Sequence, residues 1–333
     1  MQITRGNVAV LIKFVNDVDD LVQARLQAEA EASGTKKRDL RIFFFSYRKT
    51  EVPPVKKNAD GTYSAIDEEV VCNPNVGVYI APIMADYDVS FYHVDNEYDS
   101  NNIRGWASIC QNIYMWIYDT NFHEYMFPQN TWDSKIETYR FLKEQGANFI
   151  YSQSQTNQGA ITHFSRFKDY IDTKVTFDVN VNYNDLKDAF FTNYYGPAVA
   201  PMRQFFDELQ SYMEYLSVKY PSVVMGNYKE RIGMQYLWPK KILKGYLDLV
   251  EQAYQCLEPL KESQPQMYDI YKEHVLLESI FPRFALLEFY SGTYTTEEFA
   301  KEAKQFKQDC MDLKITRKTE EILLSETWKK WGV

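Results

Sequence analysis

The sequence predicts an α/β protein in which a parallel sheet is followed by an all-helical region. Short aromatic and β-branched runs alternate with helix-like apolar spacing up to about residue 175, and beyond it the strand-like runs stop. Strands that alternate with helices pair in parallel through right-handed crossovers. We therefore expect residues 1–175 to form the C-terminal half of a (β/α)8 TIM-type barrel and residues 176–333 to form an α-helical domain.

The stretch of residues 112–121 contains the most informative strand. It contains aromatic and β-branched residues without Gly or Pro, which is typical of a buried strand. Its aromatic residues share one face by the two-residue period of a strand. They are Tyr114, Trp116 and Tyr118. Asp119 and Asn121 follow at the C-terminal end, which carries the chemistry in a β/α barrel.

The other elements of the first half follow from the same patterns. The expected strands are residues 40–46, 76–82, 113–118 and 147–151. The expected helices are residues 7–32, 102–111, 133–145 and 159–172. Residues 48–73 contain Pro53-Pro54 and Asp60-Gly61, which indicates a long loop. The four strands, adjacent and parallel in sequence order, form either half of a barrel or a small open sheet, and periodicity does not separate the two.

The second half shows only helical spacing, broken at Gly196-Pro197, Tyr220-Pro221, Pro259 and Gly292. The expected helices are residues 182–193, 198–218, 238–257, 264–290, 296–310 and 316–331. We expect no strand of four or more residues here.

The composition excludes several classes of function. A net charge of −9 and a pI near 5.2 argue against binding to nucleic acid or to anionic membranes, and no apolar run has the length of a membrane span. The four cysteines lie far apart without a Cys/His cluster, so we expect no metal site, no cofactor and no disulfide framework. The N-terminus is not a signal peptide; a longer parent protein would carry any export signal, and the compartment stays open.

Aromatic residues make up 16% of the chain. Tyr and Trp offer flat apolar faces with polar tips, which suit a sugar-binding surface, although an aromatic core explains much of the same fraction.

Several short segments together resemble the bacterial family called domain of unknown function 4838. They are Pro74-Asn75-Val76, Gly105-Trp106, residues 114–118, Asn121-Phe122 and residues 190–198, whose Tyr-Tyr-Gly-Pro-Ala is the most specific. The resemblance covers about residues 5–290. It implies a relation to the α-glucuronidase and β-hexosaminidase groups of glycoside hydrolases, with a catalytic β/α barrel followed by helices.

The same resemblance implies that the front part of the barrel is absent from this chain, including the fourth strand that would supply the general acid. An open half barrel exposes sheet edges, so we expect a homo-oligomer or another partner to cover the open edge. The chain would then be the C-terminal portion of a larger protein, inactive alone.

Glycoside hydrolysis needs two carboxyl groups, one to protonate the leaving oxygen and one to activate water or attack the sugar. Asp119, directly after a strand, is our candidate general base. Asp86 and Asp88 lie two residues apart, and such proximity raises one pKa, which suits a general acid. The alternatives are a structural Asp119 and aspartates that cap their own loop.

Further side chains are candidates for contacts with a sugar. Trp116 would stack on a sugar ring, or else fill the core. The candidates for hydrogen bonds to hydroxyl groups are Tyr118, His93, Asn121 and Gln153, with His123 and His163 as weaker ones.

Three functions remain. The first is a glycoside hydrolase-like, carbohydrate-active protein with a glycan or oligosaccharide substrate. The second is a non-catalytic carbohydrate-binding or structural protein with the same aromatic cleft. The third is a helical interaction module in residues 176–333. The aromatic strand ends favour the first two.

Overall fold

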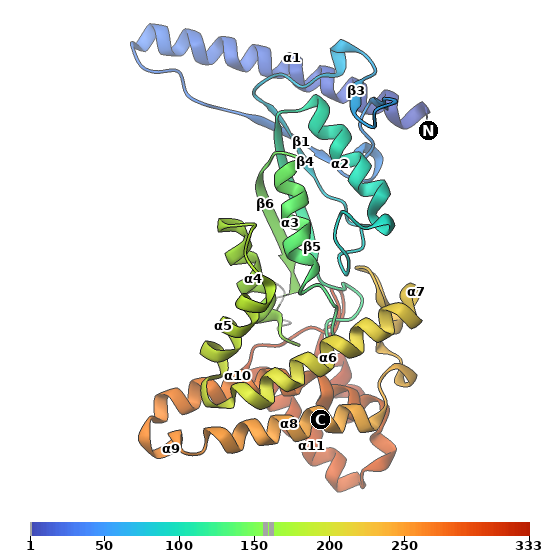
Figure 1. The fold of residues 1–333 in the computed structure, drawn as a ribbon, viewed down its shortest axis with the longest axis vertical. Coiled ribbons are helices and arrows are strands. Elements are labelled where there is room, and N and C mark those ends of the chain that lie inside the picture. Colours follow the sequence, from blue (N-terminus) through green and yellow to red (C-terminus); the bar gives the residue numbers. More distant parts are fainter. Residues whose placement is uncertain (1, 156–158, 160–162) are drawn as a thin grey trace. The chain divides into compact units, whose positions relative to one another are not determined.

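The computed structural model describes residues 2–155, 159 and 163–333. Its main sheet has four strands in the order β1-β4-β5-β6, and β1, β4 and β5 pair in parallel (Figure 1). The prediction of adjacent parallel strands in sequence order is confirmed. The strands are β1 (Ile42–Ser46), β2 (Val55–Lys57), β3 (Tyr63–Ala65), β4 (Val76–Ile80), β5 (Asn112–Asp119) and β6 (Ala147–Ser154).

Helices make up most of the remaining structure (Figure 1). In the first half they are α1 (Gln2–Ser33), α2 (Glu97–Ile109), α3 (Ser134–Glu144) and α4 (Ser165–Phe177). In the second half they are α5 (Tyr183–Tyr195), α6 (Val199–Lys219), α7 (Pro221–Val224), α8 (Lys240–Leu257), α9 (Leu260–Ser263), α10 (Pro265–Phe289), α11 (Thr296–Asp312) and α12 (Leu324–Trp331). Part of the first turn of the helix expected at 159–172 lies outside the described residues; the described helix in this region is α4, which begins at Ser165.

The chain divides into two compact units. Unit 1 comprises Met1–Ala85, Val89–Tyr118 and Glu137–Ser152, and unit 2 comprises Asp86–Asp88, Asp119–Ile136 and Gln153–Val333. The two units interleave along the sequence, and the candidate site residues are divided between them.

In unit 1, one face of the sheet is a dry core. Phe44, Val78 and Met115 are buried on adjacent strands, and the ring of Phe44 meets Trp106 of α2 edge to face, with centroids 5.5 Å apart. Aromatic pairs of this kind stabilise beyond their buried area. This face explains why the apolar runs of the sequence form strands at these positions.

Gly77 in β4 allows a close approach on the opposite face. A Cβ atom at this position would lie 2.2 Å from Cε1 of Phe43. Because glycine has no side chain, the Phe43 ring lies across β4 and stacks on Tyr114 of β5, with centroids 4.0 Å apart.

Two local predictions were wrong. The expected loop at residues 48–73 contains the antiparallel hairpin β2–β3, whose turn includes Asp60; the Asp60 side chain accepts hydrogen bonds from the backbone N–H and hydroxyl of Thr62. The expected helix at 316–331 begins only at Leu324. Residues before it form a turn, in which the Thr319 hydroxyl oxygen accepts from the N–H groups of Glu321 and Ile322.

Unit 2 is a helical unit with an aromatic core. The rings of Phe164 and Phe167 both contact Phe206 of α6, with centroids 5.1 and 5.4 Å away. Within residues 163–333, all of them described, no strand of four or more residues is present, as expected. No helix in the described part of the chain has the length and hydropathy needed to cross a membrane.

Candidate functional site

The face of the sheet opposite the dry core carries a continuous set of aromatic rings in unit 1. We call it the aromatic face; it consists of Phe43, Phe45, Tyr79, Tyr114, Trp116, Phe149 and Tyr151. All seven side chains are half-buried or exposed, and Phe45 and Phe149 are 48% and 47% exposed. Large exposed apolar surfaces often mark sites of interaction, so the aromatic face is a candidate binding surface.

The rings of the aromatic face contact one another across the strands. Tyr79 stacks on Phe45 at 5.0 Å between centroids and lies 5.8 Å from Trp116. Trp116 in turn meets Tyr151 of β6 edge to face at 4.8 Å. Each ring is therefore held by its neighbours, so the face is preorganised for a flat ligand.

The other residues predicted at the site in unit 1 lie in different surroundings. Tyr118 belongs to the same strand face as Trp116 but is only 5% exposed. His93 is half-exposed, and its Nδ1 atom accepts a hydrogen bond from the N–H of Asp95 at the start of a short 3-10 helix. This contact assigns His93 a capping role.

In unit 2, Asp119 forms the centre of a buried ion-pair cluster with Lys135, Lys168 and Asp172. Its carboxylate is 2% exposed and lies 2.8 Å from Nζ of Lys135 and 3.4 Å from Nζ of Lys168. Lys135 also donates to both oxygens of Asp172 at 2.9 Å. The Thr131 hydroxyl donates to Asp119 as well.

Electrostatics keep Asp119 ionised. Burial alone would raise the pKa of its carboxyl group, but the charges of Lys135 and Lys168 lower the pKa below its ordinary value. Lys168 also lies over the ring of Trp132, 5.2 Å from its centroid. The cluster thus contains two buried cations; Asp119 compensates the charge of Lys168 and shares with Asp172 the compensation of Lys135.

Asp88 has the opposite character. Burial, with Asp86 nearby, raises the pKa of Asp88 well above its ordinary value. Its Oδ1 atom accepts a hydrogen bond of 3.1 Å from Gln129, and its buried Oδ2 atom has no hydrogen-bond partner among the described residues. A neutral, protonated Asp88 fits these surroundings best, because a charge without partners is costly to bury.

The remaining predicted residues of unit 2 are largely structural. Asp86 accepts a hydrogen bond from the N–H of Asp88 at 3.0 Å. Asn121 binds the backbone of Lys229, accepting from its N–H at 2.9 Å and donating to its carbonyl at 2.8 Å. Gln153 is half-buried in β6.

The predicted residues therefore fall into two groups. Trp116, Tyr118 and His93 belong to unit 1, whereas Asp86, Asp88, Asp119, Asn121 and Gln153 belong to unit 2. That Asp86, Asp88, Asp119, Trp116, Tyr118 and His93 line one cleft stays a prediction.

Sequence reasoning missed the two lysines of the cluster, although the sequence carries a signal for each. Lys168 lies on the buried stripe of α4, four residues after Phe164 and three before Ile171. Lys135 occupies the same kind of position in α3, seven residues before the fully buried Leu142. A lysine within an apolar stripe requires a buried acid as its partner.

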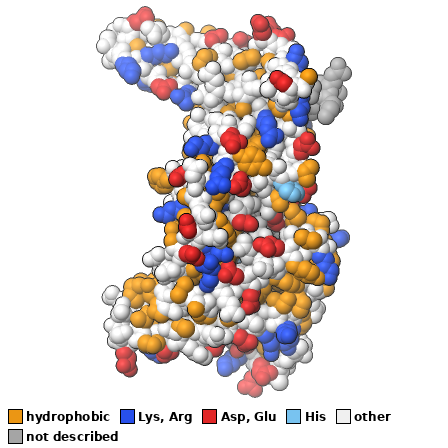
Figure 2. Space-filling model, in the orientation of Figure 1, with side chains coloured by type: hydrophobic (Ala, Val, Ile, Leu, Met, Phe, Trp, Pro, Cys, Tyr) orange, Lys and Arg blue, Asp and Glu red, His pale blue; other side chains and the backbone are white. Residues whose placement is uncertain are grey.

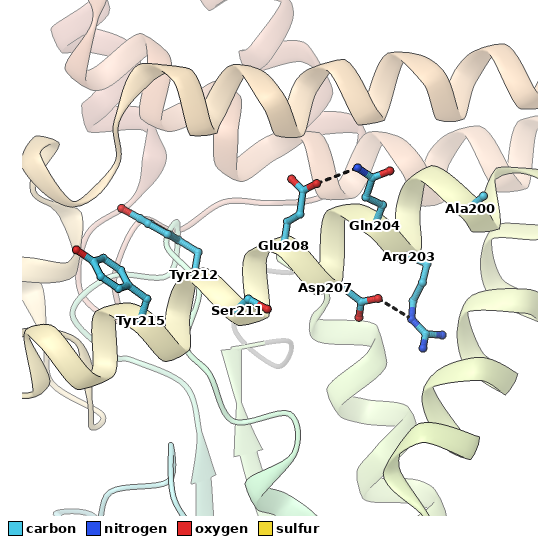
Figure 3. A pocket seen from close by; sticks show the side chains of 8 residues that line it. All are labelled: Ala200, Arg203, Gln204, Asp207, Glu208, Ser211, Tyr212 and Tyr215. Carbon is cyan, nitrogen blue, oxygen red and sulfur yellow. Dashed lines mark hydrogen bonds and ion pairs between the residues drawn. The ribbon is translucent and has the colours of Figure 1, made fainter.

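Two depressions of unit 2 are lined by residues that the structure describes. One, of about 700 Å³, runs along α6, and all eight residues that line it belong to that helix (Figure 3). Its polar side chains pair with one another, Arg203 with Asp207 and Gln204 with Glu208. A smaller and more enclosed one, of about 220 Å³, lies among several helices.

Over the visible surface of the molecule, acidic and basic side chains are interspersed rather than gathered into one basic patch (Figure 2). A nucleic-acid-binding surface normally requires such a patch.

Comparison with known proteins gives one match. No curated protein and no solved structure matches the chain. The model of the family described as domain of unknown function (DUF4838) matches residues 5–207, which include the whole four-stranded sheet, most of α1, helices α2 to α5 and the beginning of α6. The match is shorter at its C-terminal end than the resemblance to residue 290 that we expected. The chain belongs to the DUF4838 family.

Proposed function

We propose that this protein binds carbohydrate on the aromatic face. The observation that carries the proposal is the set of half-exposed rings around Trp116 and Tyr79, on a sheet whose other face is dry core. The C–H groups on one side of a pyranose ring pack on aromatic rings, and tyrosine hydroxyls supply polar contacts at the edge of such a surface. A non-catalytic glycan-binding role needs no acid pair.

The proposal extends to the architecture. Four adjacent parallel strands with an aromatic, half-exposed face resemble the inner wall of a barrel that has been opened. In this proposal the sheet is the C-terminal half of a (β/α)8 barrel, residues 176–333 form the helical domain after it, and a second copy or another chain covers the open edge.

Trp116→Ala tests the binding site. We expect it to weaken binding of an oligosaccharide about tenfold, which corresponds to about 1.4 kcal/mol, because it removes a stacking surface. A screen of immobilised glycans would first identify the ligand, and calorimetric titration would then measure its dissociation constant.

The matched control is Tyr236→Ala, which removes a 56% exposed aromatic ring from unit 2. It should leave the affinity unchanged. An equal loss in both variants, or no loss in Trp116→Ala, would refute a binding site on the aromatic face.

Hydrolysis of glycosidic bonds is the second candidate function. It is favoured by the opposite pKa shifts of Asp88 and Asp119, because an acid and a base whose pKa values are pushed apart are the usual pair in such enzymes. Asp88 would protonate the leaving oxygen, and Asp119 would activate water. Asp119 is buried and forms ion pairs, which argues against its contact with a reacting water molecule or with a sugar. Carbohydrate binding is therefore the stronger proposal.

Asp88→Asn separates the two functions. The amide resembles the protonated carboxyl group in charge and shape, so we expect the variant to fold and to bind glycan with unchanged affinity. It has no proton to give to a leaving oxygen, so any release of reducing sugar by the wild type should be lost. Undiminished hydrolysis by the variant would remove Asp88 from the reaction.

A further inference from the structure

The small pocket of unit 2 has the features of a ligand site that is independent of the sugar-binding proposal. Its volume is about 220 Å³. Its walls come from α4, α5, α10 and the residue that follows α11, so segments distant in the sequence converge on it. The lining residues are Arg166, Tyr194, Glu273, His274, Leu277 and Leu313.

His274 is held in one orientation and one tautomer. Its ring stacks on Tyr194 with centroids 3.6 Å apart and an angle of 4° between the planes, and its Nδ1 atom lies 2.6 Å from the Tyr194 carbonyl oxygen. A carbonyl oxygen only accepts, so Nδ1 carries the proton. Burial lowers the pKa of His274, which keeps the ring neutral. Its Nε2 atom is therefore a hydrogen-bond acceptor.

Arg166 supplies the positive charge of the pocket. Its one ion pair among the described residues is a long contact of 3.5 Å from Nη1 to Asp169. The neighbouring Glu278 forms no ion pair with Arg166 among the described residues, although the Arg166 charge offsets part of the rise that burial causes in the pKa of Glu278. It accepts hydrogen bonds from the N–H of Phe164 and the hydroxyl of Tyr195, and burial raises its pKa to about 8. A guanidinium with free donors binds a carboxylate in a bidentate manner.

The rest of the lining is one further charge and an apolar surface. Glu273 is exposed and carries a negative charge, whereas Leu277 is buried and Leu313 is half-buried. One cation, one anion, one neutral hydrogen-bond acceptor and two leucines thus surround a space of about 220 Å³.

We propose that this pocket binds a free α-amino acid with a small apolar side chain. The carboxylate of the ligand pairs with Arg166, and its ammonium group donates to Glu273 and to Nε2 of His274. The side chain of the ligand packs on Leu277 and Leu313. The opposite charges of the pocket match those of a zwitterion, whereas a simple acid or a simple amine would leave one charge without a partner.

Three probes of nearly equal shape test this assignment on the full chain by calorimetric titration. L-valine carries both charges, valinamide lacks the carboxylate, and isovalerate lacks the ammonium group. We expect valine to bind at least about tenfold more tightly than either analogue. Equal affinity for the three probes, or no binding of valine at millimolar concentration, would overturn the proposal.

Two variants assign each charge to its residue. Arg166→Gln should abolish the preference for valine over valinamide, and Glu273→Gln should abolish the preference for valine over isovalerate. Glu273 is exposed, so its variant is expected to fold even if Arg166→Gln does not. His274→Phe keeps a ring for stacking on Tyr194 but removes the acceptor, and should weaken valine more than isovalerate.

Arg203→Gln on α6 is the matched control. This arginine lies on the shallow depression of the same unit and forms ion pairs with Asp188 and Asp207. It should leave all three affinities unchanged. If it reduces valine binding as much as Arg166→Gln does, the ligand is not in the pocket and the proposal fails.

Discussion

Replacing Asp119 with alanine is expected to lower the free energy of unfolding by about 3–5 kcal/mol, because it leaves Lys168 buried without its ion pair and leaves Lys135 with Asp172 alone. The loss is expected to exceed that of a simple cavity at the same place. Chemical denaturation monitored by circular dichroism would measure it.

Asp207→Ala is the matched control for this prediction. Asp207 also pairs with two cations, Lys187 and Arg203, but its side chain is 46% exposed. Water replaces the lost partner there, so the expected loss is below about 1 kcal/mol. If both variants lose the same small amount, Asp119 does not organise a buried cluster.

Glu278→Gln is expected to reduce the loss of folding stability that the protein undergoes at mildly alkaline pH. Burial raises the pKa of Glu278 from the usual 4.5 to about 8 in the folded protein. Between these two values the folded state holds a proton that the unfolded chain has released, so stability falls as the pH rises through this range. The full effect on the free energy of unfolding amounts to up to about 5 kcal/mol.

Glutamine keeps the neutral form of the side chain at every pH. Its amide oxygen can accept from the N–H of Phe164 and its amide N–H can donate to the hydroxyl of Tyr195. Thermal unfolding between about pH 5 and pH 9 should show a smaller loss of stability for the variant than for the wild type. A parallel decline of the two curves would contradict the prediction.

Glu298→Gln provides a control of opposite sign. Its carboxylate accepts from the N–H of Thr295 at the start of α11, which lowers its pKa. The contribution of such a group is present above its usual pKa and is lost only as the pH falls through its folded pKa. This variant should therefore leave the alkaline loss of stability unchanged.

The strands of the main sheet could be predicted because each is an apolar run of residues that favour strands. The hairpin β2–β3 could not, because its strands have only three residues each and include the exposed Lys56 and Lys57. A strand of this length is defined by its partner across the hairpin and not by its own periodicity.

The candidate site also has features that the sequence predicted and features that it did not. The alternation of Tyr114 and Trp116 along β5 predicted one aromatic face, but the half-buried state of the two rings depends on tertiary packing, which no local pattern encodes. The position of Asp119 at the strand end was predictable, but its burial was not, because that depends on Lys135 and Lys168 from two other helices.

The most direct test of carbohydrate binding on the aromatic face is an NMR measurement of intermolecular nuclear Overhauser effects between a bound oligosaccharide and tryptophan rings. Trp116→Phe assigns the ring signals of Trp116 among those of the 6 tryptophans. The proposal predicts cross-peaks from sugar C–H protons to the indole ring of Trp116, and also to the rings of Tyr79 and Tyr151, which contact it. Cross-peaks confined to other tryptophans, or a bound sugar with none to these three rings, would contradict it.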